Sequence, residues 1–196
     1  MRAVTDQEVR TFLAEHPGMR CEGRHIFYDN PEANCVVLDL PREPGQLVFL
    51  ARLVAALGYE EGHFRGAVLW ITEWGVWDPQ VEAVGFKALE RFRLSFGESR
   101  SLESASAHYF RHDEFVDTVA LLLQPMLIGW DAYYVPQWAY GGTDHFIFVS
   151  HDSYLAVVTR TAEMHRRVLQ GLHGFEWLKY REQPLERFCP GARPKE

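Results

Sequence analysis

The chain has 196 residues, 47% of them hydrophobic and 24% charged, which is typical of a soluble globular protein long enough for one sizeable domain. Its net charge of −7 argues against nucleic acid as the main partner, because binding the phosphate backbone needs a basic face. No apolar run approaches the ~18 residues of a membrane-spanning helix. The three cysteines have no CxxC spacing, so they predict neither a disulfide framework nor a zinc ribbon. We expect a cytoplasmic protein without a cofactor, with a single domain over 1–189 and a flexible tail over 190–196.

The first half of the chain predicts helices and strands in alternation. A capping box from Thr5 to Glu8 starts the first helix. Pro44 and Gly45 open a later helix that is apolar on nearly every face and should therefore be buried. In chain order we expect a helix over 5–13, a strand, turn and strand over 24–40, a helix over 44–57 and a buried strand over 67–72.

The second half predicts further helices and then a group of strands. Asp78 caps a helix that has Pro79 at its first position. Asp113 caps another helix, which must kink or end near Pro125 because proline removes a backbone hydrogen bond. The segment 153–158 is a strand or an extra helical turn, and its β-branched residues favour the strand. The other elements expected are strands over 108–111, 131–136 and 145–151 and a last helix over 161–174.

These elements predict an α/β or α+β fold, in which a single-domain mixed sheet of about five or six strands carries helices packed on it. The first strands are separated by helices and should run parallel through right-handed crossovers. The later strands are joined by shorter loops and could be antiparallel.

Three tryptophans lie close together in the segment LWITEWGVWD, residues 69–78. Strand alternation places Trp70 and Trp74 on one face of the sheet, and we interpret Trp70 as a core residue. Glu73 and Trp77 lie near the carboxyl end of the strand, where ligands bind in open parallel sheets. They line a pocket, or Trp74 and Trp77 merely cover the seam between helix and sheet.

Ser150, His151 and Asp152 are the residue types of a hydrolase triad. Consecutive strand residues point to opposite faces, however, and cannot form the hydrogen-bonded chain of a triad among themselves. The segment instead predicts a strand end and a turn in which Asp152 or Ser153 bonds backbone N–H groups. His151 is still a candidate for acid–base chemistry or hydrogen bonding.

Histidines and carboxylates can also meet through the fold. If the strands that end near 40, 73 and 150 all run in one direction, one sheet edge collects Asp39, Glu73, His151 and Asp152. Such a set can perform general acid–base chemistry or hold a divalent metal. His108 and His112 are not expected to share a metal, because an extended chain separates their rings by ~13 Å.

Aromatic residues crowd the segment 130–140, and loops that display Trp and Tyr are common at partner-binding surfaces. Trp138 can equally fold back over the core. The leading hypothesis is a non-enzymatic binding or regulatory protein that grips a basic protein partner, like an antitoxin or immunity protein by analogy only. Its candidate binding residues are Glu73, Trp74, Trp77, Trp138 and Tyr140.

The alternative is an enzyme that acts on a small polar substrate through Glu73, His151 and Asp152, with Asp39 at the same edge. Two observations separate the hypotheses. An approach of Glu73 and His151 to within about 4–6 Å favours the enzyme. An exposed apolar patch at Trp77 and Trp138 favours the binding protein.

Overall fold

The computed structural model describes residues 1–57, 64–74, 79–138, 144–183 and 186–190, except for the side chains of 79–82 and 138. Within these ranges the elements are, in chain order, β1 (Arg2–Val4), α1 (Asp6–Ala14), β2 (Met19–Glu22), β3 (His25–Tyr28), β4 (Asn34–Asp39), α2 (Pro44–Ala55), β5 (Phe64–Glu73), α3 (Pro79–Ser95), β6 (Ala107–Arg111), α4 (Phe115–Ile128), β7 (Asp131–Trp138), β8 (His145–Ser150), β9 (Tyr154–Thr159), α5 (Ala162–Leu172) and β10 (Tyr180–Glu182). The expected tail lies almost wholly outside the described residues. No described helix is long and apolar enough to cross a membrane.

Eight strands form one sheet in the order β1-β6-β5-β7-β8-β9-β4-β10, and β2 pairs with β3 in a separate two-stranded sheet. The expectation of helices on a sheet is confirmed, but five or six strands is too few. β1, β2 and β10, which no prediction included, have only three or four residues each. Strands this short carry too few residues for alternation to be visible in the sequence.

Every neighbouring pair in the large sheet is antiparallel, so the expectation of parallel first strands is wrong. β4 and β5 do point the same way, but β9, β8 and β7 lie between them. Every residue of β8 is buried, as are nearly all residues of β9. Strands that are apolar on both sides must be covered on both sides, which explains why this meander occupies the centre of the sheet.

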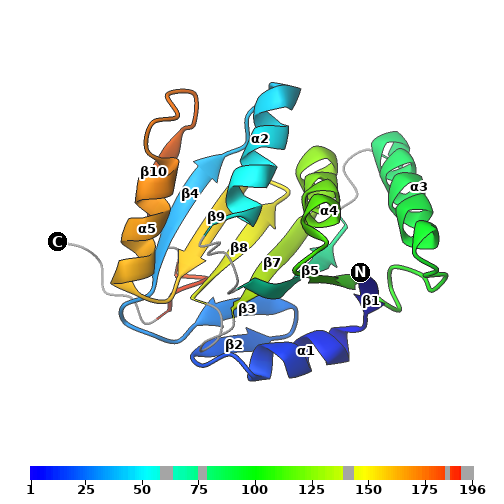
Figure 1. The fold of residues 1–196 in the computed structure, drawn as a ribbon, viewed down its shortest axis with the longest axis horizontal. Helices are drawn as coiled ribbons and strands as arrows, with labels where there is room; N and C mark the ends of the chain where they lie inside the picture. The colour runs from blue at the N-terminus through cyan, green and yellow to red at the C-terminus, as the bar shows by residue number, and fades with distance from the viewer. Residues whose placement is uncertain (58–63, 75–78, 139–143, 184–185, 191–196) are drawn as a thin grey trace.

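The fold has three layers (Figure 1). Helices α2 to α5 cover one face of the large sheet, and α1 with the β2–β3 hairpin covers the other. Each face therefore has its own core. The helix-side core includes Leu50, Val54, Leu69, Leu122, Trp130 and Ile147. The hairpin-side core includes Val9, Tyr28, Trp70, Tyr133, Phe146 and Phe188.

Helix starts follow the sequence at two positions and depart from it at a third. The capping box at Thr5 and the cap at Thr161 are both present. The cap of α4 is Glu114 rather than Asp113, and it makes no side-chain capping bond. The Glu114 carboxylate instead accepts the backbone N–H of Arg111 at 2.8 Å and pairs with the N-terminal amine. The first contact is local and the second is distant in sequence, and α4 starts one residue later than expected.

Helix α4 ends at Ile128, three residues after Pro125 and near the position at which the sequence predicts a kink or an end. Pro125 is buried inside the helix, which continues to Ile128 and ends at Gly129, whose φ is 79°. Proline removes one helical hydrogen bond. Its neighbours Leu122 and Met126 are buried in the helix-side core, and this packing holds the last turn in place.

Candidate functional site

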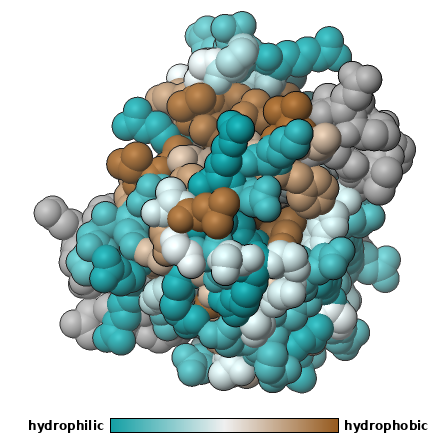
Figure 2. Space-filling model, turned by 90° about the vertical axis from the view of Figure 1, so that its right-hand side faces the viewer, coloured by the Kyte–Doolittle hydropathy of each residue, from teal (hydrophilic) through white to brown (hydrophobic). Residues whose placement is uncertain are grey.

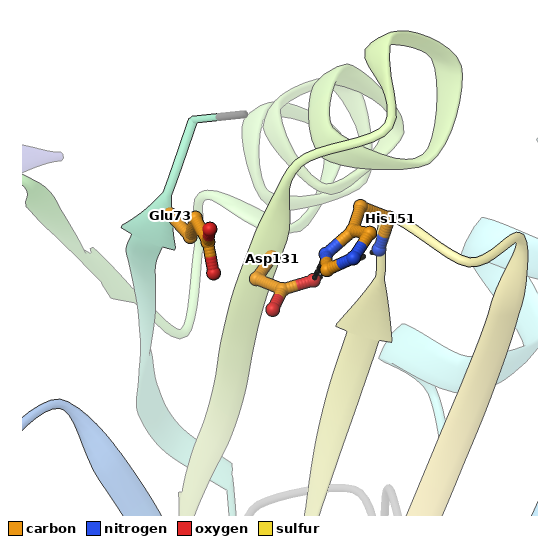
Figure 3. Close-up of side chains that lie close together, drawn as sticks. All are labelled: Glu73, Asp131 and His151. Atoms are coloured by element: carbon orange, nitrogen blue, oxygen red, sulfur yellow. Dashed lines mark hydrogen bonds and ion pairs between the residues drawn. The ribbon is translucent and has the colours of Figure 1, made fainter. Parts of the chain in front are cut away.

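The ends of three central strands meet at one edge of the sheet. β5 and β8 run in the same direction, and β7 runs between them in the opposite one. Glu73 is the last residue of β5, Asp131 is the first of β7, and His151 follows β8 (Figure 3). One nitrogen or carboxylate oxygen from each side chain lies within 4.8 Å of the others. We call this group the Glu73–Asp131–His151 cluster.

A buried carboxylate orients the histidine of the cluster. Oδ1 of Asp131 lies 2.8 Å from Nδ1 of His151 and accepts the backbone N–H of the same residue, also at 2.8 Å. The Asp131 side chain is only 4% exposed, and that of His151 is 26% exposed. A carboxylate can only accept, so Nδ1 carries the proton. In the neutral ring, Nε2 is then the nitrogen whose lone pair can accept a proton or bind a metal.

Glu73 reaches the cluster through an irregularity in its strand. The register of β5 against β7 shifts between Ile71 and Glu73, which pairs with Asp131. Bulges of this kind re-aim side chains and are common beside active sites. The prediction that Trp70 and Trp74 share one face of the sheet is wrong, because the register shift interrupts the alternation between them. Trp74 packs against the helix-side core, and Trp70 lies in the hairpin-side core.

The cluster can support two kinds of chemistry. The Asp131–His151 pair has the geometry of an acid–base dyad, in which a carboxylate fixes the ring and Nε2 transfers the proton. One imidazole and two carboxylates are also a ligand set that suits Mn²⁺, Fe²⁺ or Zn²⁺. Glu73, Asp131 and His151 would hold such a cation, which could polarise a substrate oxygen or lower the pKa of a bound water.

The cluster includes only part of the expected set. β4 runs in the same direction as β5 and β8, so Asp39 does lie at this edge. It is two strands from β8, which is roughly 10 Å, and Arg181 donates a hydrogen bond to it at 3.0 Å. Asp152 is close, with Oδ1 3.6 Å from Nε2 of His151, but its side chain is 70% exposed.

The turn after β8 contains the expected hydrogen bond from a backbone N–H to a side chain, but the acceptor is Ser150 instead of Asp152 or Ser153. The backbone N–H of Asp152 donates to the hydroxyl of Ser150 at 3.1 Å. Ser150 therefore has a structural role in the turn, and the carboxylate partner of His151 is Asp131.

Trp70 is a core residue, as expected. It is fully buried, and its Nε1 donates to Asp6 at 3.0 Å and to Ser106 at 3.1 Å. The expected extended segment around His108 is confirmed as β6. Trp77, Asp78 and Tyr140 lie outside the described residues, as does the side chain of Trp138, so the proposed binding surface at these positions stays a prediction.

Asp131 is the site residue that the sequence analysis did not single out. A parallel sheet would have placed the start of each strand at the opposite edge from Glu73 and His151. In an antiparallel sheet, the start of a strand lies beside the ends of its two neighbours. The available signal was an aspartate that opens the otherwise apolar segment DAYYVP.

No family model, curated protein or solved structure matches this chain significantly.

Proposed function

We propose that the protein is an enzyme that acts on a small polar substrate, with His151 as the residue that accepts and returns a proton. The observation that carries this proposal is the 2.8 Å contact between Nδ1 of His151 and the buried Asp131 carboxylate. A histidine held in this way presents Nε2 as a base when the ring is neutral. Glu73 adds a second carboxylate within 4.8 Å, which can orient the substrate or share its proton.

The tautomer of His151 tests the proposal without a substrate. We expect nitrogen-15 NMR to find the proton of the neutral ring on Nδ1 in the wild type. Asp131→Ala removes the acceptor altogether, so the proton should move to Nε2, the nitrogen that carries it in the isolated neutral ring. A neutral wild-type ring that carries its proton on Nε2 would contradict the proposed role of Asp131.

Turnover tests the proton transfer itself. The wild type is assayed against small chromogenic carboxylic and phosphoric esters, beside His151→Gln and Asp131→Asn. We expect His151→Gln to lower kcat about 100-fold or more, the usual contribution of general acid–base catalysis. The exposed residues His112 and Asp113 give the matched controls His112→Gln and Asp113→Asn, which should keep wild-type activity. Wild-type rates in His151→Gln would overturn the proposal.

Metal addition separates the two chemistries of the cluster. If a cation assists the reaction, turnover should rise with Mn²⁺ or Zn²⁺ and fall with a chelator, and Glu73→Gln should weaken the dependence on metal. If the dyad works alone, the rates should not depend on metal.

A second candidate function is the binding of a basic protein partner. Exposed apolar side chains on α3 and α4 favour it: Val84 is 70%, Val116 80% and Leu127 60% exposed. On the face shown in Figure 2, apolar side chains gather in the upper half among hydrophilic ones. An apolar surface on a chain of net charge −7 suits a partner with a basic rim. Binding of one purified basic partner that Val84→Asp and Leu127→Asp abolish, with an unchanged fold, would support this function.

A further inference from the structure

A cavity of about 630 Å³ lies at the same sheet edge as the cluster. Its walls come from the end of β4, the start of α2, the last turns of α4, the β8–β9 turn and the segment 177–179. Pockets for small molecules commonly have volumes of about 300–1,000 Å³. The cavity is thus large enough for a small organic ligand.

The cavity shares the β8–β9 turn with the cluster and also borders helix α4, whose end lies close to that turn. The β8–β9 turn supplies His151 to the cluster and Ser153 to the cavity wall. Helix α4 supplies Met126 to the wall, and at its end a Cβ on Gly129 would lie 3.9 Å from the backbone oxygen of His151. A ligand in the cavity is therefore held beside the turn that carries His151.

The floor of the cavity is apolar and one wall is aromatic. Leu40, Leu47 and Met126 line the floor, and Leu47 and Met126 are buried in the helix-side core. The Trp177 ring forms the wall, and its edge-on contact with Phe49, at 5.9 Å between centroids, fixes its orientation. These surfaces suit the apolar body of a ligand.

The charges at the cavity favour an anion. Asp39 lines it too, but its carboxylate is compensated by Arg181 at 3.0 Å. The other charged lining residues are Arg42 and Lys179, and neither forms an ion pair with any residue in the described part of the chain. Two uncompensated cations on a protein of net charge −7 make this site locally attractive to negative groups.

We propose that this cavity is the substrate-binding pocket and that the substrate is a small molecule with an apolar, ring-sized body and an anionic group. The apolar body packs against Trp177 and the floor, and the anionic group lies between Arg42 and Lys179. The assignment of this ligand as a substrate rests on the proposed function of His151. Binding of the ligand itself depends only on the cavity.

Phenyl phosphate is a suitable probe because it joins an aromatic ring to an anion. We expect it to bind the wild type in an NMR titration and to shift the amide signals of 40–47 and 177–179. Benzyl alcohol has the ring without the charge, and inorganic phosphate has the charge without the ring. Each of these two compounds should bind at least about tenfold more weakly than phenyl phosphate. Equal binding of all three, or shifts confined to other regions, would overturn the proposal.

Charge-matched variants test the two cations. Arg42→Gln/Lys179→Gln should raise the Kd of phenyl phosphate about tenfold or more. The control Arg65→Gln/Arg166→Gln removes two exposed cations outside the cavity and should leave Kd within about twofold. Equal Kd values for the two double variants would refute the assignment of the anionic group.

The experiment also separates failure of the pocket from failure of the proposed function. Asp131→Asn should bind phenyl phosphate like the wild type and lose turnover. Retained turnover in Asp131→Asn would contradict the role of the dyad while leaving the pocket intact. Unchanged binding in Arg42→Gln/Lys179→Gln would contradict the pocket while leaving the dyad intact.

Discussion

Ser153 is the one non-glycine residue of the described chain with a positive φ, 63°. It ends the three-residue turn 151–153 between β8 and β9, a type of hairpin loop that favours glycine at its left-handed position. This conformation is less favourable by about 1–2 kcal/mol for residues other than glycine. Strained residues of this kind cluster at functional sites, and here the turn carries both His151 and part of the cavity wall.

Relief of this strain gives a prediction at the scale of the residue. Ser153→Gly should raise the free energy of unfolding by about 0.5–1 kcal/mol, because the gain in the turn exceeds the entropy that glycine adds to the unfolded chain. Urea denaturation checks this. Ser99→Gly, at an exposed position without a positive φ, should lower stability instead. A loss of stability in Ser153→Gly would mean that the serine side chain stabilises the turn by more than the strain costs.

At the scale of the element, the contact between α3 and α4 depends on a glycine in the middle of a helix, and nothing in the sequence pattern predicts that this position must be small. Gly85 lies in the middle of α3, and a Cβ there would stand 2.5 Å from Cδ1 of Ile128. Ile128 is the last residue of α4, three residues before Asp131. The close approach of the two helices therefore positions the chain that enters β7.

A double-mutant cycle tests this contact. Gly85→Ala alone should lower the free energy of unfolding by up to about 2 kcal/mol, because overpacking costs about 1–3 kcal/mol and the better helix propensity of alanine offsets about 1 kcal/mol of it. In an Ile128→Ala background the same change should instead raise it by up to about 1 kcal/mol, the helix-propensity difference. Gly45→Ala is the control, because nothing lies within 4 Å of a Cβ at that helical position. Additive effects in the cycle would show that the two residues are not coupled.

Helices and central strands were predictable from local patterns, and their tertiary arrangement was not. The box at Thr5 and the apolar run of β8 specify their elements because nearby residues supply the bonds and the burial. Asp113 misled the prediction of the α4 cap by one residue, because the cap is Glu114, which pairs with the N-terminal amine far away in the sequence. Short edge strands such as β10 exist only through pairing with β4.

At the scale of the whole molecule, buried histidines link stability to pH, and the largest shifts among those described are at His108 and His145. Burial, with a smaller effect from Arg93, lowers the pKa of His108 to about 3, and Glu98 opposes this. Neither ring nitrogen of His108 has a hydrogen-bond partner within the described ranges. Burial lowers the pKa of His145 to about 4, against the charge of Asp144. Both rings are neutral in the folded protein at neutral pH.

The sign of the pH dependence follows from these shifts. Below the ordinary histidine pKa of 6.5 the unfolded chain binds protons that the folded chain excludes. The contribution of each of these two histidines to stability should be constant well above that pH and should fall as the pH drops toward 4, by up to about 1.4 kcal/mol per pH unit. Urea denaturation at pH 7, 6 and 5 measures the slope. His108→Leu should reduce the slope by up to about 1.4 kcal/mol per pH unit, the contribution of one histidine, and an unchanged slope would exclude His108 as a cause.

The sequence by itself determined that this chain forms helices packed on a sheet, that Trp70 is buried, and that Glu73 and His151 lie at strand ends. These properties follow from apolar periodicity and capping residues, which act over a few positions. Only the tertiary structure decided the strand order, the antiparallel pairing and the meeting of Asp131 with His151. Strand order depends on which strands bury both faces together, a property of the whole sheet that no single segment encodes.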